Sequence, residues 1–137
     1  MSKLNIDPNT LSRPDRYKLM CALVIPRPIA LVTTISKNGI VNAAPFSFFN
    51  VFSDKPSIVA LGVNARPEGG LKDTAANIKE QKEFVVHMVT FDIADQMNIS
   101  CVNFPPEVSE IDEANFTLRQ SHLIKTPTIN ESLVAFE

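Results

Sequence analysis

The sequence has 137 residues, of which 45% are hydrophobic, and this length and composition suit one domain over residues 1–137 with a core of ordinary size. The 13 lysines and arginines against 15 acidic residues give a net charge of −2, which argues against nucleic acid and anionic membranes as partners. Because no run is long enough to span a membrane as a helix and the first residues lack the apolar core of a signal peptide, we expect a cytoplasmic protein.

The first part of the chain predicts a lead-in followed by a two-stranded hairpin. Residues 1–26 are expected to be irregular or partly helical. The β-branched segment 27–36 predicts a strand. Asn38 and Gly39 predict a type I′ turn, since both residues tolerate a positive φ. The partner strand is expected over residues 40–51.

Further strands and a helix are expected after this hairpin. Pro45 has no amide donor, so its strand should lie at an edge, carry a bulge or break there. The apolar run 57–63 predicts a buried strand. Asp73 is expected to cap a short helix, and residues 83–90 predict another strand. The apolar face of that helix is expected to hold Leu71, Ala75 and Ile78.

The last third of the chain has a weaker pattern. Asp92 is expected to cap a second helix, with Ile93, Met97 and Cys101 on one face. Short strands are expected within residues 116–121 and 132–137. Because the chain stops inside this last strand-like run, we allow for a domain that is truncated at its C-terminus.

Strands outnumber helices in this pattern, and the first two are joined by a tight turn. This favours an antiparallel sheet that closes into a small barrel with helices packed outside it. A doubly wound nucleotide-binding fold is disfavoured, because strand-helix-strand alternation is missing from the first half and the sequence contains neither GxGxxG nor GxxxxGK[ST].

Few side chains suggest metal binding or acid–base catalysis. Cys21 and Cys101 form no CxxC pair and are predicted to be buried thiols. His87 lies in an apolar strand and is predicted to be a satisfied core or interface residue, whereas His122 should lie at the surface. The acidic segment 109–113 is interpreted as a solvated turn. The sequence therefore predicts no metal site, catalytic triad or paired carboxylates.

The segment NAAPFSFFN, residues 42–50, combines small, polar and aromatic side chains. Small residues let a flat ligand approach the backbone closely, hydroxyl and amide groups can bind its polar edge, and aromatic rings supply stacking area. Composition alone favours the alternative, a core strand with a bulge. Strand alternation puts Asn42, Ala44, Phe46, Phe48 and Asn50 on one face, and Ala43, Pro45, Ser47 and Phe49 on the other.

Two other segments could bind an anion. Thr33 and Thr34 occupy opposite faces of a strand, so one hydroxyl is able to reach a ligand, although threonine is common in strands for its shape alone. Arg66 and Lys72 flank a glycine pair just before a helix N-terminus, where Thr74 adds a hydroxyl. Unpaired amides at such a terminus favour a phosphate. The alternative is a solvated loop followed by an ordinary helix cap.

Taken in order, these segments resemble the flavin reductase-like family, whose members bind FMN in a split β-barrel. The resemblance extends over residues 27–89. It consists of R-P-x-x-x-V-T-T, a glycine turn, N-x-A-P-F-S-x-F and K-D-T-x-x-N-I. The residues that carry it are Arg27, Pro28, Val32, Thr33, Thr34, Gly39, Asn42, Ala44, Pro45, Phe46, Ser47, Phe49, Lys72, Asp73, Thr74, Asn77 and Ile78.

The resemblance implies a mainly β, antiparallel split barrel with flanking helices, and a homodimer with FMN near the subunit interface. It implies that Arg66, Lys72 and Thr74 lie on the phosphate side. NADH or NADPH would reduce the flavin without an obligatory protein acid or base, so no catalytic residue is predicted. The implied contacts of the flavin ring and ribityl chain are Thr33, Thr34, Asn42, Ala43, Ala44, Pro45, Phe46, Ser47, Phe48 and Phe49.

Two departures from the family pattern occur. The turn that commonly has two prolines has only Pro56 here, and His87 stands where asparagine is common. Family members are also usually longer, and their later strands help to form the nicotinamide pocket. The alternative function is therefore an electron-carrier module that binds flavin without a nicotinamide site of its own.

Overall fold

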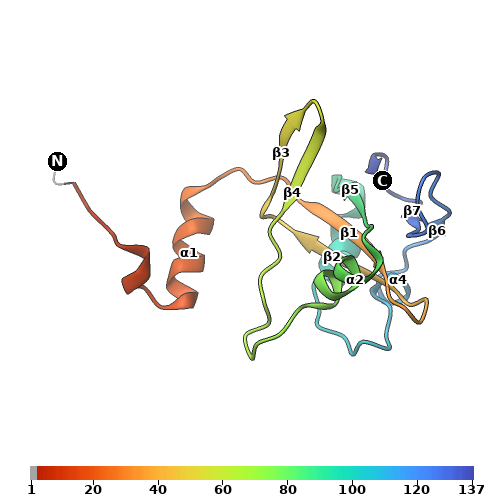
Figure 1. Ribbon diagram of the computed structural model, residues 1–137, viewed down its shortest axis with the longest axis horizontal. Helices are drawn as coiled ribbons and strands as arrows, with labels where there is room; N and C mark the ends of the chain where they lie inside the picture. The colour runs from red at the N-terminus through yellow and green to blue at the C-terminus, as the bar shows by residue number, and fades with distance from the viewer. Residues whose placement is uncertain (1–2) are drawn as a thin grey trace.

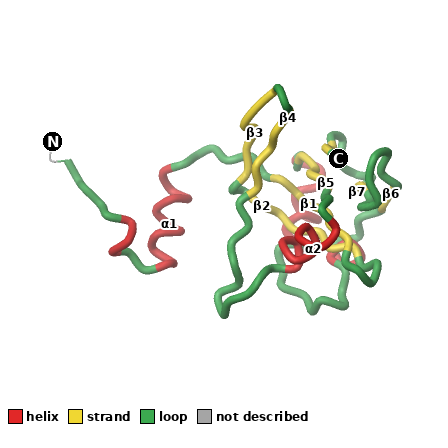
Figure 2. Tube along the Cα trace, viewed as in Figure 1, coloured by secondary structure: helices red, strands yellow, loops and turns green. Residues whose placement is uncertain are grey.

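The computed structural model describes residues 3–137, and its centre is a four-stranded antiparallel sheet with the order β2-β1-β5-β8 (Figures 1 and 2). β1, rich in β-branched residues, lies inside the sheet, paired with β2 on one side and with β5 on the other. The strands of this sheet are β1 (Ala30–Ile35), β2 (Val41–Phe46), β5 (Val85–Met88) and β8 (Ala135–Phe136).

The remaining strands of residues 3–137 form two smaller, two-stranded sheets. β3 (Phe49–Asp54) and β4 (Ser57–Leu61) form a hairpin that projects beyond the central sheet in Figure 1. β6 (Leu118–Arg119) pairs with β7 (Thr128–Ile129). The expectation of a sheet-rich, antiparallel fold is confirmed. Within residues 3–137, however, the three sheets do not close into a barrel.

The helical elements lie around the central sheet, except for the first two. α1 stands apart from the body of the molecule in Figure 1, so the partly helical lead-in is confirmed. Its N-cap Ser12 accepts a hydrogen bond from the Asp15 amide. The helical elements are η1 (Pro8–Thr10), α1 (Arg13–Leu23), α2 (Asp73–Gln81), η2 (Phe91–Ile93), α3 (Ala94–Ile99) and α4 (Glu110–Glu113).

The β1–β2 hairpin forms where it is predicted, but its turn is of another type. Gly39 has a φ of +84°, whereas Asn38 is not among the residues with positive φ. The Ser36 amide donates to the Ile40 carbonyl (2.9 Å), and the Gly39 amide donates to the Ser36 carbonyl (3.0 Å). The prediction of type I′ is therefore wrong, because a three-residue loop places only its last residue in the left-handed region.

The strand predicted over residues 40–51 is divided in the structure. β2 runs through Pro45 to Phe46 and lies at an edge of the central sheet, as expected for a residue without an amide donor. The chain then turns at residues 47–48, so the predicted alternation of faces does not continue into β3. β4 is also not the buried strand that was predicted, because Ile58 is 44% exposed.

The central sheet separates two hydrophobic clusters, because alternate residues of β1 point to opposite faces. Leu31 joins a cluster that α3, α4 and β7 complete. Ala30 and Val32 join a second cluster with Phe46, Phe49 and Val86. Asp92 does not cap the helix expected there, because it lies inside η2 and α3 follows with Ile93 at its N-cap. Ile93 and Met97 are buried as expected, but Cys101 is exposed and does not extend that face.

His87 is fully buried in β5 and both of its ring nitrogens have partners. Nδ1 lies 2.9 Å from the Leu31 carbonyl oxygen, and Nε2 accepts from the Ile129 amide at 2.9 Å. Nδ1 therefore carries the proton and Nε2 does not. Burial lowers the pKa of this imidazole from 6.5 to about 4. The prediction of a satisfied core histidine is confirmed.

This buried imidazole predicts a loss of stability in mild acid. Its stabilising contribution is complete above pH 6.5 and is lost as the pH falls toward its folded-state pKa of about 4, because the unfolded state then binds a proton that the folded state excludes. We expect this loss to approach about 3 kcal/mol in the free energy of unfolding. Urea unfolding of the wild type and of His87→Gln between pH 7 and pH 4 checks it. Equal pH slopes in the two proteins would contradict the prediction.

Candidate functional site

A groove of about 430 Å³ lies along the β2 edge of the central sheet. It is enclosed by β2, by the segment 66–74 that leads into α2, and by the loop 100–104 after α3. The structure thus brings together two segments that the sequence singled out separately. The predicted site residues that line the groove are Asn42, Ala44, Pro45, Phe46, Arg66, Lys72 and Thr74.

Other predicted site residues lie in the interior. The Thr33 hydroxyl donates to the Pro127 carbonyl (2.8 Å), and the Thr34 hydroxyl accepts from the Asn77 amide group (3.1 Å). Ala43 is fully buried in the first hydrophobic cluster, and Phe49 is buried in the second. None of these four residues is among those that line the groove, and their assignment as direct ligand contacts stays a prediction.

Ser47 and Phe48 form the turn that follows β2 and contact the N-terminal part of the chain. The Ser47 hydroxyl accepts from Arg27 Nε at 3.3 Å, and the Phe48 ring lies 5.7 Å from the ring of Tyr17. Arg27 Nη1 also donates to the carbonyl of Val24 at 2.7 Å, at the end of α1. This turn therefore ties α1 to the sheet in the single chain, and its role in ligand binding stays a prediction.

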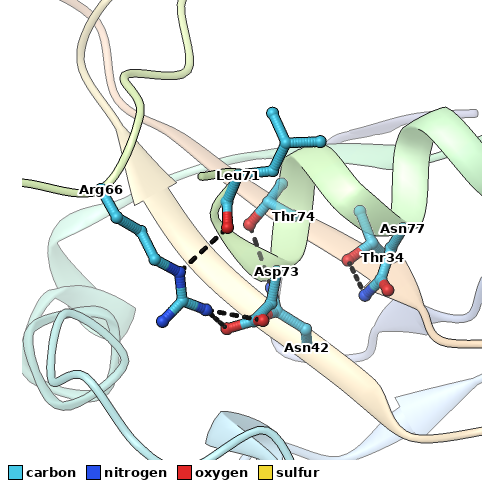
Figure 3. Close-up of polar contacts among 7 residues, drawn as sticks. All are labelled: Thr34, Asn42, Arg66, Leu71, Asp73, Thr74 and Asn77. Carbon is cyan, nitrogen blue, oxygen red and sulfur yellow. Dashed lines mark hydrogen bonds and ion pairs between the residues drawn. The ribbon is translucent and has the colours of Figure 1, made fainter. Parts of the chain in front are cut away.

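α2 is attached to the sheet by two hydrogen bonds between amide and hydroxyl side chains. Asn42 Nδ2 donates to Thr74 Oγ1 at 3.2 Å, and Asn77 Nδ2 donates to Thr34 Oγ1 at 3.1 Å (Figure 3). Thr74 and Asn77 are the buried residues of this helix. The predicted apolar face is wrong at Leu71, which is 50% exposed.

The segment before α2 is held by an arginine. Arg66 Nη2 lies 2.8 Å from both carboxylate oxygens of Asp73, and its Nε donates to the Leu71 carbonyl at 2.9 Å (Figure 3). Asp73 is thus the first residue of the helix and not its cap, which is Lys72. The prediction of an Asp73 cap is wrong because the guanidinium competes for its carboxylate. The Arg66–Asp73 pair is the one ion pair among residues 3–137.

Glu110 was not expected in the site, yet it closes one side of the groove. Its side chain is buried, and Oε2 accepts from the Ala43 amide at 3.1 Å. Burial raises the pKa of this carboxyl above 4.5. The neighbouring Ser109 hydroxyl donates to the Val41 carbonyl at 2.6 Å and accepts from the Ile111 amide. The interpretation of residues 109–113 as a solvated turn is therefore wrong. The sequence does contain a signal for a helix here, since a serine followed by acidic residues is typical of a helix N-terminus.

The cysteines are less buried than expected. Cys101 lines the groove and is exposed, and Cys21 is half-buried, so the prediction of buried thiols is wrong. Both are free cysteines. His122 is exposed, as predicted. In the part of the chain that the structure describes, no three His, Cys, Asp or Glu side chains gather as a metal site would need.

The groove suits a flat, partly apolar ligand that carries an anionic group. Ala44 and Pro45 give one wall a small, flat surface, and Phe46 lines the same wall with only 8% of its surface exposed. At the other wall α2 begins, and its first amides are not used within the helix. Lys72 lies at that helix start as a cation, while the charge of Arg66 is offset by Asp73.

Comparison with known proteins gives consistent matches. The model of the family described as flavin reductase like domain matches residues 22–137. An uncharacterized protein of Aquifex aeolicus (strain VF5) is 49% identical over 121 residues, which cover 88% of this chain and 62% of that protein.

Two solved structures place the fold in the same group. Nitrilotriacetate monooxygenase component B from Bacillus cereus is 36% identical with a TM-score of 0.92, covering 98% of this chain and 66% of that chain. A Shewanella frigidimarina structure described as a flavin reductase with a split barrel domain has a TM-score of 0.79 at 19% identity, covering 94% of this chain and 63% of that chain. The second likeness shows the fold alone. This chain spans less than two thirds of the length of each of these proteins.

Proposed function

This chain belongs to the flavin reductase-like family, and we propose that it binds FMN in the groove and reduces it with NADH or NADPH. The observation that carries the proposal is the joining of two segments distant in sequence, residues 42–46 and 66–74, around one groove. The first segment offers a flat wall and the second offers a helix N-terminus with a lysine. An FMN molecule requires both features in one place, because it has a planar ring at one end and a phosphate at the other.

The groove agrees with FMN in size and in chemistry. Its volume of about 430 Å³ lies in the range of small-molecule sites. Ala44 has no side chain beyond Cβ, so a planar ring is able to approach the strand closely. Lys72 and the first amides of α2 would hold the phosphate.

The role of the protein in this proposal is binding and orientation. FMN itself supplies the hydride-accepting chemistry when it is bound. Asn42 keeps Thr74 against the sheet, which fixes the helix start that would hold the phosphate. Ala44 and Pro45 would lie against the ring and so limit its orientation.

The visible absorption spectrum tests the proposed function most directly. The purified protein, with FMN added if it is colourless, is expected to show protein-bound flavin bands that NADH or NADPH bleaches under anaerobic conditions. Flavin bands that neither nicotinamide bleaches would instead support the electron-carrier alternative. A protein that retains no flavin after FMN is added and excess removed would contradict both functions.

Replacement of the lysine at the start of α2 tests the phosphate end of the groove. Lys72→Ala is expected to weaken FMN about tenfold and to leave riboflavin nearly unchanged, because only FMN carries the phosphate. Quenching of flavin fluorescence measures both affinities. Lys79→Ala, in the last turn of the same helix, is the matched control. Equal losses of affinity for FMN and riboflavin would contradict the assignment of Lys72 to the phosphate site.

The proposal also includes a homodimer and a split barrel that the strands of the three sheets form together. It places the protein in the cytoplasm, where NADH and NADPH are present. The β3–β4 hairpin supports the dimer, because Val51, Phe52 and Ile58 are 63%, 71% and 44% exposed on it. Exposed apolar side chains also occur on α1, where Leu23 is 71% exposed. Within residues 3–137 no helix is long and apolar enough to cross a membrane.

A charge on the β3–β4 hairpin is expected to weaken the proposed dimer. Phe52→Asp should shift the mass in sedimentation equilibrium from dimer toward monomer, because an aspartate cannot be buried there unpaired. Phe91→Asp is the control, since Phe91 is 95% exposed but belongs to η2 and not to the hairpin. A monomeric wild type, or the same effect from both variants, would contradict this role of the hairpin.

A further inference from the structure

Glu110 occupies a wall that two cavities share. It lines the groove, and it also lines a smaller cavity of about 70 Å³ between the β1–β2 turn, α2 and the segment 105–108. Only 9% of Glu110 is exposed, and the bond from the Ala43 amide to Oε2 fixes its carboxyl group against the edge of β2. The residues that line both cavities are Asn42, Asp73 and Glu110.

The charges around this wall are not balanced. The Asp73 carboxylate, which borders both cavities, is paired with Arg66 at 2.8 Å. Lys72 is the remaining cation of the groove lining, and Glu68 adds an acidic group to it. Cys101 is the other titratable group of that lining. On α4 itself, Asp112 and Glu113 are exposed to solvent, where water screens them.

We propose that Glu110 determines how the groove discriminates between phosphorylated and unphosphorylated flavins, because its ionised carboxylate repels the phosphate of FMN. This inference rests on the proposed function, since it concerns flavin binding in the same groove. The neutral acid imposes no such repulsion. The preference for FMN over riboflavin therefore falls as Glu110 ionises.

The position of Glu110 makes such an effect physically strong enough to measure. A carboxylate that is shielded from water interacts with a nearby charge through a lower effective dielectric than a surface carboxylate does. The phosphate of FMN carries one to two negative charges near neutral pH, and riboflavin carries none. The raised pKa of Glu110 places its ionisation closer to neutral pH than that of an ordinary glutamate.

Glu110→Gln tests the proposal with little change of shape. The glutamine carbonyl still accepts from the Ala43 amide, so the variant removes the charge and keeps the hydrogen bond. Dissociation constants of FMN and riboflavin are measured by fluorescence quenching from pH 5 to pH 8 for both proteins. At pH 8 we expect the FMN affinity to rise by about three- to tenfold in the variant, with riboflavin nearly unchanged. At pH 5 the difference is expected to shrink.

The comparison is made between two ligands in one protein, so effects of the substitution on stability cancel in their ratio. Ionisation of the FMN phosphate itself cancels between the two proteins at each pH. Glu113→Gln, on the exposed face of α4, is the matched control and is expected to leave the ratio unchanged. Glu110→Met, which also lacks the charge, is a second variant in case the glutamine protein folds poorly.

Three results would overturn the proposal. An FMN-to-riboflavin affinity ratio that is equal in the wild type and in Glu110→Gln at pH 8 would show that Glu110 does not repel the phosphate. An equal change in Glu113→Gln would assign it to the general charge of α4. A wild type that binds neither FMN nor riboflavin would overturn the proposed function and, with it, this inference, so the two failures are distinguishable.

Discussion

The rest of the site depends on two hydrogen bonds beneath α2, from Asn42 to Thr74 and from Asn77 to Thr34. A helix that buries polar side chains against a sheet is stable only when these groups are paired, because an unpaired buried amide or hydroxyl is costly. The two bonds join α2 to two adjacent strands, so the helix is able to take only one position on the sheet. That position sets Lys72 and the first amides of α2 beside the β2 wall of the groove.

Local pattern predicted the central strands well. β1 and β5 have the β-branched, apolar composition of interior strands, and Pro45 correctly indicated an edge. The face of α2 was not predictable in the same way. Leu71 and Ile78 suggested an apolar stripe, whereas the buried residues of the helix are a threonine and an asparagine that form hydrogen bonds with strand residues far away in the sequence. Tertiary pairing decided the orientation, and periodicity within the helix contains no information about it.

The candidate site shows the same division between local and distant effects. Residues 42–46 and 66–74 were recognised because each is a compact motif with its own chemistry. Residues 47–49 leave the groove because the chain turns directly after Phe46, which strand alternation alone does not foresee. Glu110 was missed because its contact with Ala43 spans 67 positions in the sequence. Its acidic neighbours on α4 made it look like part of a solvated segment.

The covering of the β2 edge also bears on how copies of this protein associate. An open strand edge invites pairing with another strand, the step that begins sheet aggregation. On β2, Ser109 binds the Val41 carbonyl, Glu110 binds the Ala43 amide, and Pro45 has no amide to offer. Two side chains and a proline therefore block backbone hydrogen bonding along this edge. Association of folded molecules is directed away from strand addition here and toward surfaces that bury side chains.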